Sequence, residues 1–165
     1  TETLPIIRDL VDRIVLVDDD AIADAMLHLI ERKKVVAEGA GATPLAALLS
    51  GAVPVERDST VILVISGGNI DSPLLERTIH HALVRRGRVL RCRVALDDRP
   101  GTLSRLLAVV AQEQGNILRI SHETGLADLP VLSVQVLLEI ETRDRDHIAS
   151  IIAAMETAGY RPEKT

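Results

Sequence analysis

The sequence has 165 residues, of which 47% are hydrophobic and 26% charged, a composition typical of one globular domain or two small ones. The net charge of -5 does not favour a nucleic-acid partner or an anionic membrane surface. The single cysteine, Cys92, excludes an intramolecular disulfide and a cysteine-rich zinc site, and no other metal site is predicted. No segment resembles a signal peptide, and no apolar run reaches the roughly 18 residues of a membrane span, so a cytoplasmic location is expected.

The first half of the sequence predicts part of an α/β domain. Two apolar runs indicate buried strands, and the second, TVILVI, suits a strand that is buried on both faces. Three helices are expected around them. Asp18, Asp19 and Asp20 can cap the first, Pro44 lies near the start of the second, and Ser72 caps the third. Because two strands make a poor sheet, residues 1–87 are interpreted as a piece of a larger domain. The expected strands are residues 13–17 and 60–65.

The second half, residues 88–165, predicts an α+β unit. Three segments alternate apolar and polar residues, as half-buried strands do, and two further segments carry an apolar stripe at helical spacing. With a weak fourth strand at the end, the order is β-α-β-β-α-β, the ferredoxin-like split pattern. Five arginines from Arg85 to Arg93 are interpreted as a solvated connector rather than as a binding patch. The expected strands are residues 91–96, 117–122, 132–140 and 160–164.

Three functional classes share this ferredoxin-like topology, and the residue types separate them. An RNA-recognition module stacks bases on aromatic side chains of its central strands, and the segments ILRISH and LSVQVLLEI contain no aromatic residue. A metal-carrying module needs a pair of thiolates, which one cysteine cannot supply. The amino-acid-sensing class therefore remains.

A D-R-P-G-x-L motif opens the first helix of this unit, and a G-N-I motif follows that helix. Pro100 stiffens the turn, Gly101 lets the backbone approach a ligand, and amides at the helix start can take the carboxylate of an amino acid. Asn116 offers both a donor and an acceptor. The alternative for Gly101 and Asn116 is a tight turn and a helix C-cap that bind no ligand. The motif residues are Asp98, Arg99, Pro100, Gly101, Leu103, Gly115, Asn116 and Ile117.

With these motifs and this order of elements, residues 91–160 resemble an ACT domain. The resemblance implies that copies of the domain pair and that an amino-acid effector lies at the interface of the pair. The expected effector is isoleucine, valine, threonine or serine. The residues implied to bind it are Asp98, Arg99, Pro100, Gly101, Thr102, Asn116 and Ile117.

The first half carries a second resemblance, to the catalytic domain of threonine dehydratases (threonine ammonia-lyases) of the catabolic type. These are pyridoxal-phosphate enzymes of fold type II, the fold of the tryptophan synthase β subunit, and in them an ACT regulatory domain follows the catalytic domain. Residues 1–87 would be the C-terminal remnant of the catalytic domain, and residues 88–165 would be the ACT domain. The implied parent reaction converts L-threonine to 2-oxobutanoate and ammonia. The segments that carry the resemblance are LPIIRDLVDRIVLVDDDAI, VVAEGAGATPLAAL and VILVISGGNID.

The same resemblance implies a set of cofactor-binding residues. Ser66 matches the serine that faces the pyridine nitrogen, with Gly67 beside it, and Glu38 and Gly39 would lie near the cofactor. A neutral hydroxyl at this place does not force the ring nitrogen to stay protonated, which suits β-elimination of a hydroxyl group. The alternative is that Ser66 and Gly67 form only a turn between a strand and a helix.

The sequence departs from the enzyme family in the residues that react with the cofactor. The family needs a Schiff-base lysine and a glycine-rich phosphate loop, whereas Lys33, Lys34 and Lys164 lie in no recognisable motif and no such loop occurs. The chain alone is therefore expected to hold no catalytic residue, to bind no pyridoxal phosphate and to be inactive. It begins at Thr1 as if within a longer protein, and self-association is expected. The alternative function is a free-standing ACT-domain sensor or dimerisation module, and an active enzyme is the least favoured hypothesis.

Overall fold

The computed structural model describes residues 2–124, 130 and 132–165. The chain divides into two compact units, Thr1–Ala82 and Leu83–Thr165, and each unit is described by itself. This division falls a few residues before the boundary that the sequence suggests between residues 87 and 88. Helix α4 (Ser72–Arg85) carries the chain across the division. No helix among the described residues is long and apolar enough to cross a membrane.

The first unit is built from helices that pack around small apolar side chains. Helix α2 (Asp19–His28) begins after Asp18, whose carboxylate accepts a hydrogen bond of 2.7 Å from the amide of Ala21. It continues into a single π-helical segment, η1 (Leu29–Lys33), and α3 (Gly39–Leu49) packs against α2. The buried residues that these elements share are Ala25, Met26, Leu29, Ala37, Ala42, Leu45 and Ala46.

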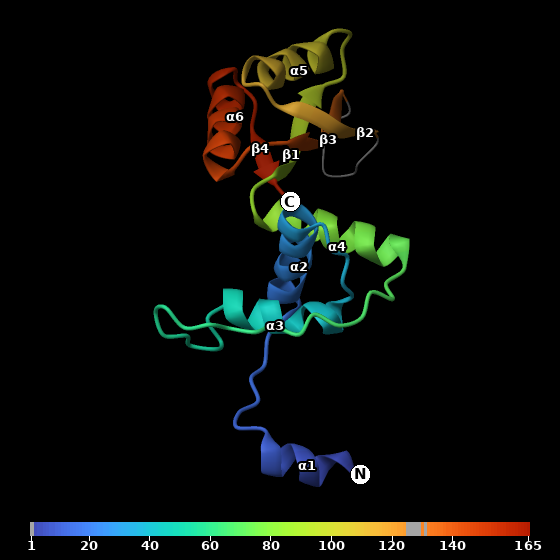
Figure 1. Cartoon of the computed structure of the whole chain (residues 1–165). Helices are drawn as coiled ribbons and strands as arrows, with labels where there is room; N and C mark the ends of the chain where they lie inside the picture. Colours follow the sequence, from blue (N-terminus) through green and yellow to red (C-terminus); the bar gives the residue numbers. More distant parts are fainter. Residues whose placement is uncertain (1, 125–129, 131) are drawn as a thin grey trace. The chain divides into compact units, whose positions relative to one another are not determined.

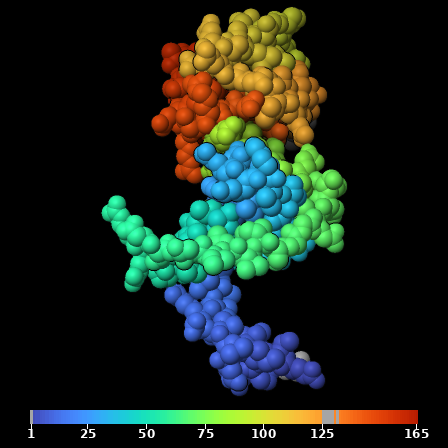
Figure 2. Space-filling view, viewed as in Figure 1, coloured from blue at the N-terminus to red at the C-terminus, as the bar shows by residue number. Residues whose placement is uncertain are grey.

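Two helices of this unit, the first and the third, are unusual. Helix α1 (Thr3–Leu10) has no buried residue, and its side chains are open to view in dark blue in Figure 2. Pro44 lies inside α3 and not near its start, because Glu38 is extended and the helix begins directly after it at Gly39. The expectation for Pro44 is therefore wrong by more than one helical turn.

Both strands expected in the first unit are also wrong. Residues 13–17 and 60–65 carry no strand hydrogen bonds to any described residue. Leu63 packs against the core of the unit, whereas Ile62 and Val64 beside it are 85% and 71% exposed. A strand buried on both faces needs neighbouring strands that satisfy its backbone groups, and the described part of this unit supplies none. The apolar run therefore buries only one of its sides.

The second unit is a four-stranded antiparallel sheet with two helices on one face (Figure 1). The strands lie in the order β2-β3-β1-β4. The elements follow one another in the βαββαβ order that the sequence predicts. Their bounds are β1 (Val89–Asp97), α5 (Thr102–Gln112), β2 (Asn116–Glu123), β3 (Ser133–Glu141), α6 (Arg145–Thr157) and β4 (Pro162–Lys164).

The core of this unit lies between the sheet and its two helices. Alternate residues of β1 and β3 face the helices and are buried, while the residues between them face away. Because the strands are antiparallel, Val89 lies opposite Glu141 and Asp97 lies opposite Ser133. The largest fully buried side chains of the cluster are Leu106, Leu138, Ile140, Ile151, Met155, Val94, Val110, Val136 and Cys92.

Candidate functional sites

The four residues implied to bind the cofactor lie together in the first unit. The amide of Glu38 donates a hydrogen bond of 3.1 Å to the carbonyl oxygen of Gly67. Gly67 has a φ of 76°, and a Cβ there would lie 2.5 Å from Oε1 of Glu38. A Cβ at Gly41 would overlap the carbonyl group of Ser66. The start of α3 and the segment after residue 65 therefore cross at close range, and both glycines are needed for this crossing.

This crossing offers a limited set of chemical groups. Ser66 is exposed, and Glu38 is half-buried at the start of α3, where it makes no side-chain capping bond. The hydroxyl of Ser66 suits a ring nitrogen, and a helix start suits an anion. Two of the three lysines, Lys33 and Lys34, lie exposed at the end of η1, and the Nζ of Lys34 donates to the carbonyl of Glu31 at 2.9 Å. The described residues of this unit thus fit one side of a pyridoxal-phosphate site and supply neither a buried amine nor a phosphate loop.

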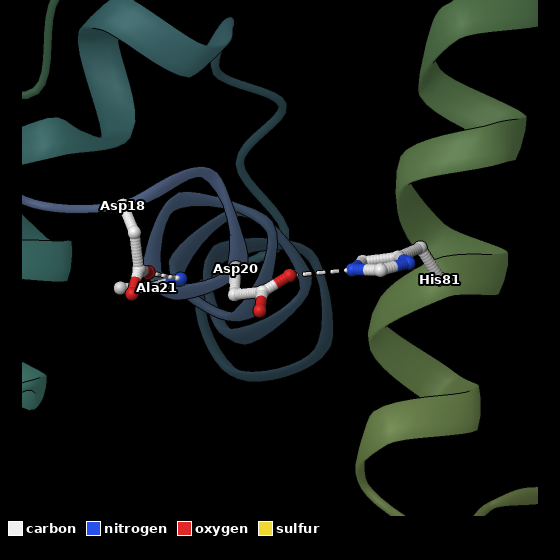
Figure 3. A network of polar contacts seen from close by, with 4 residues as sticks. All are labelled: Asp18, Asp20, Ala21 and His81. Atoms are coloured by element: carbon white, nitrogen blue, oxygen red, sulfur yellow. Dashed lines mark hydrogen bonds and ion pairs between the residues drawn. The ribbon is translucent and has the colours of Figure 1, made fainter.

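A second polar contact in the first unit joins α2 to α4. Oδ1 of Asp20 lies 2.7 Å from Nε2 of His81, and Figure 3 shows the imidazole pointing at the carboxylate. Beside this contact lies a cavity of about 360 Å³ whose lining includes Met26 and Ile70. The pair holds two helices together at the rim of an apolar cavity. No group of three or more His, Cys, Asp or Glu side chains among the described residues could hold a metal ion.

The D-R-P-G segment forms a tight turn between β1 and α5. The amide of Thr102 donates to the carbonyl of Arg99 at 3.2 Å, and Gly101 has a φ of 85°, which favours glycine. The hydroxyl of Thr102 accepts a bond of 3.2 Å from Arg105 and is largely buried. Asp98 and Arg99 are exposed, so the turn presents charged side chains and a helix start to solvent.

The G-N-I segment lies at the start of β2. The side-chain amide of Asn116 donates a hydrogen bond of 3.0 Å to Oε2 of Glu141, its partner on β3. Ile117 packs against the core of the unit. A Cβ at Gly115 would lie 2.8 Å from Cγ1 of Val110, so close packing explains this glycine. Of the three residues, only Asn116 presents a polar group at the surface.

The structure does not bring the D-R-P-G turn and Asn116 together within one unit. Asn116 and Val89 both lie opposite Glu141, whereas Asp97 lies opposite Ser133 at the other end of β1. A strand rises about 3.4 Å per residue, so the eight steps of β1 separate the two ends by about 27 Å. The seven residues implied to bind the effector thus form two separate groups.

Around Asn116 the structure reveals a polar cavity of about 320 Å³ that the sequence did not indicate. The residues that line it include Arg88, Asn116, Glu141 and Arg143, which are exposed and form its rim, and His147, which is buried and forms part of its floor. These residues lie at or next to the ends of β1, β2 and β3, except for His147 on α6. Only the pairing register between the strands brings them together, and no local motif in the sequence signals that register.

Comparisons with known proteins find relatives for both halves of the chain. Residues 1–67 match the family described as pyridoxal-phosphate dependent enzyme. The chain is 44% identical over 158 residues to an L-threonine ammonia-lyase of Geobacter sulfurreducens and 39% identical to one of Thermotoga maritima. Each alignment covers 96% of this chain and 39% of the relative. A catabolic L-threonine dehydratase of Staphylococcus aureus is 39% identical over 50% of this chain and 24% of its own length.

Residues 1–67, less than half of the chain, are thus similar to pyridoxal-phosphate-dependent enzymes. Over nearly its whole length the chain is a homologue of part of threonine dehydratase, which confirms the resemblance drawn from the sequence. It spans 39% of the length of the two ammonia-lyases that it matches.

Proposed function

We propose that the chain is the regulatory, C-terminal part of a threonine dehydratase. Residues 88–165 would be its ACT domain, which binds an amino-acid effector, and residues 1–87 would be the remaining part of the catalytic domain. The observation that carries the proposal is the D-R-P-G turn at the start of α5 in a βαββαβ unit. The chain that contains this unit is 44% identical over 96% of its length to an L-threonine ammonia-lyase. The parent reaction would convert L-threonine to 2-oxobutanoate and ammonia.

The separation of the two effector-binding groups supports a paired arrangement. A single amino acid is far too small to contact both the Asp98–Thr102 turn and Asn116 across about 27 Å of one unit. One effector can contact both groups only where a second copy supplies one of them. Homo-oligomerisation through residues 88–165 is therefore part of the proposal. Regulation follows only if the effector binds two states of the enzyme with different affinities.

The first unit would contribute to the cofactor site of the complete enzyme. Ser66 would hold its hydroxyl at the ring nitrogen, and Glu38, Gly39 and Gly67 would shape the backbone beside it. Bound pyridoxal phosphate supplies the electron sink for loss of the substrate hydroxyl. Because the described residues supply no buried amine for this cofactor, we expect the chain alone to catalyse no threonine turnover.

Thermal unfolding of the full chain with isoleucine, valine, threonine or serine tests the regulatory part of the proposal. An amino acid at one hundred times its Kd adds about 2.7 kcal/mol of stability, which raises the Tm by several degrees. Light scattering on the same samples reports whether the chains pair. A folded protein whose Tm is unmoved by all four amino acids would contradict an amino-acid sensor.

The catalytic part is tested by adding pyridoxal phosphate and threonine and then reducing with borohydride. We expect no 2-oxobutanoate and no lysine adduct in the digested protein. Turnover together with a reducible adduct at Lys33 or Lys34 would show that the catalytic unit is complete.

A further inference from the structure

The polar cavity beside Asn116 has the form of a binding site in the second unit. It has a volume of about 320 Å³, at the lower end of the usual range for ligand pockets. It lies where β1 and β2 begin and β3 ends, at the end of the sheet opposite the D-R-P-G turn. The cavity and the turn are therefore independent features of the same unit.

The floor of this cavity is neutral, and its polar atoms are already bonded. Thr142 and His147 are only 3% and 4% exposed. The hydroxyl of Thr142 donates to the carbonyl of Gly87 at 2.7 Å. Nδ1 of His147 accepts from the amide of Arg143 at 3.1 Å, and its Nε2 donates to the carbonyl of Glu113 at 2.7 Å. Both ring nitrogens are thus occupied, so His147 has a structural role and recognition is left to the rim.

The rim brings opposite charges close together. Arg88 and Arg143 carry guanidinium groups, which suit a carboxylate in shape and charge. Glu141 accepts one bond from Asn116, and a carboxylate has about four acceptor positions, so Glu141 can also take an ammonium group. A small site with both kinds of charge matches the head group of an amino acid, which carries one carboxylate and one ammonium.

The lining also selects the side chain of the ligand. None of the described residues that line the cavity is Leu, Ile or Val. A branched aliphatic side chain would gain no apolar contact there, whereas a hydroxyl group can bond to the side-chain amide of Gln114, whose Oε1 already accepts a bond of 3.4 Å from Nη1 of Arg143. We propose that this cavity binds a small hydroxyl-bearing amino acid, serine or threonine, with Arg88 and Arg143 on its carboxylate and Glu141 on its ammonium. The inference rests on the proposed amino-acid binding by residues 88–165 and adds a second site to it, within one unit and apart from the D-R-P-G turn.

Calorimetric titration of the full chain and of two variants tests this assignment. Glu141→Gln keeps an acceptor for Asn116 and removes the charge for the ammonium, and Arg143→Gln removes a charge for the carboxylate. Each variant has a control on β1 or β4, away from the cavity: Glu163→Gln for the first and Arg93→Gln for the second. Circular dichroism confirms that all four variants are folded.

We expect threonine and serine to bind more tightly than valine and isoleucine. Glu141→Gln and Arg143→Gln should each raise the Kd for threonine at least about tenfold, and both controls should leave it unchanged. The hydroxy acid that lacks the amino group and the amino alcohol that lacks the carboxylate should bind at least about tenfold more weakly than threonine.

Two other outcomes would overturn the assignment of the cavity, and they have different consequences for the proposed function. If an amino acid binds and Asp98→Ala weakens it while Glu141→Gln does not, effector binding stands and this cavity is not its site. If none of the four amino acids binds the folded chain, both the cavity assignment and the proposed regulatory function are wrong.

Discussion

Replacement of Gly115 by alanine tests whether packing or ligand binding explains the glycine of the G-N-I segment. The added Cβ would lie 2.8 Å from Cγ1 of Val110, 2.9 Å from Cγ2 of Ile140 and 3.1 Å from Cδ1 of Ile151, and all three side chains are fully buried. Overpacking of this kind costs about 1–3 kcal/mol. Gly115 is not among the residues with positive φ, so alanine also gains about 0.4–1 kcal/mol from the unfolded state. The difference between these ranges runs from about 0 to 2.6 kcal/mol, and because three fully buried side chains lie within 3.1 Å of the added Cβ, we expect a net loss of about 1–2 kcal/mol.

Urea unfolding followed by far-UV circular dichroism measures this loss. With the usual urea dependence for small proteins, the midpoint for Gly115→Ala should fall by about 0.5–1 M. A second substitution, Val110→Ala, removes the nearest clashing methyl group, so the double variant should lose less stability than the two single losses added together. Unchanged stability in Gly115→Ala, or fully additive losses in the double variant, would refute the packing explanation.

Three further predictions concern single residues of the second unit. Burial raises the pKa of the Cys92 thiol from 9.0 to about 11, so the contribution of this thiol to stability is present below pH 9 and is lost as the pH rises towards 11. A thiol reagent at pH 8 should therefore label the buried Cys92 only after unfolding, and rapid labelling of the folded chain would contradict this. Thr142→Val leaves the carbonyl of Gly87 without its 2.7 Å bond and should cost about 1–3 kcal/mol in urea unfolding, which an unchanged midpoint would disprove. Gly101→Ala forces alanine to a φ of 85° and should cost about 1–2 kcal/mol, whereas Gly101→Asn should cost less; equal Tm values for the three proteins would show that the turn is not strained.

The second unit could be predicted from the sequence because its signals are local. Val134, Val136 and Leu138 alternate with polar or half-buried residues, and the structure buries all three on one face of β3. Asp144 directly precedes the last helix, where an aspartate is a typical cap, and its carboxylate accepts a bond of 2.8 Å from the amide of His147. Periodicity and capping act within a few residues, so they are visible without knowledge of the fold.

The strands of the first half and the polar cavity could not be predicted, because both depend on distant parts of a chain. The run from Thr60 to Ile65 has the composition of a buried strand, yet a strand exists only where a neighbouring strand takes its hydrogen bonds. The cavity depends on the register that places Asn116 opposite Glu141. A shift of one residue in that register would turn Glu141 towards the other face of the sheet.

The most direct test of the central claim is isothermal titration of the folded full chain with threonine, serine, valine and isoleucine. We expect saturable heat from at least one of them, and the largest affinity for threonine or serine. The absence of heat from all four, at several temperatures and with circular dichroism showing a folded chain, would contradict an amino-acid-binding regulatory part of threonine dehydratase.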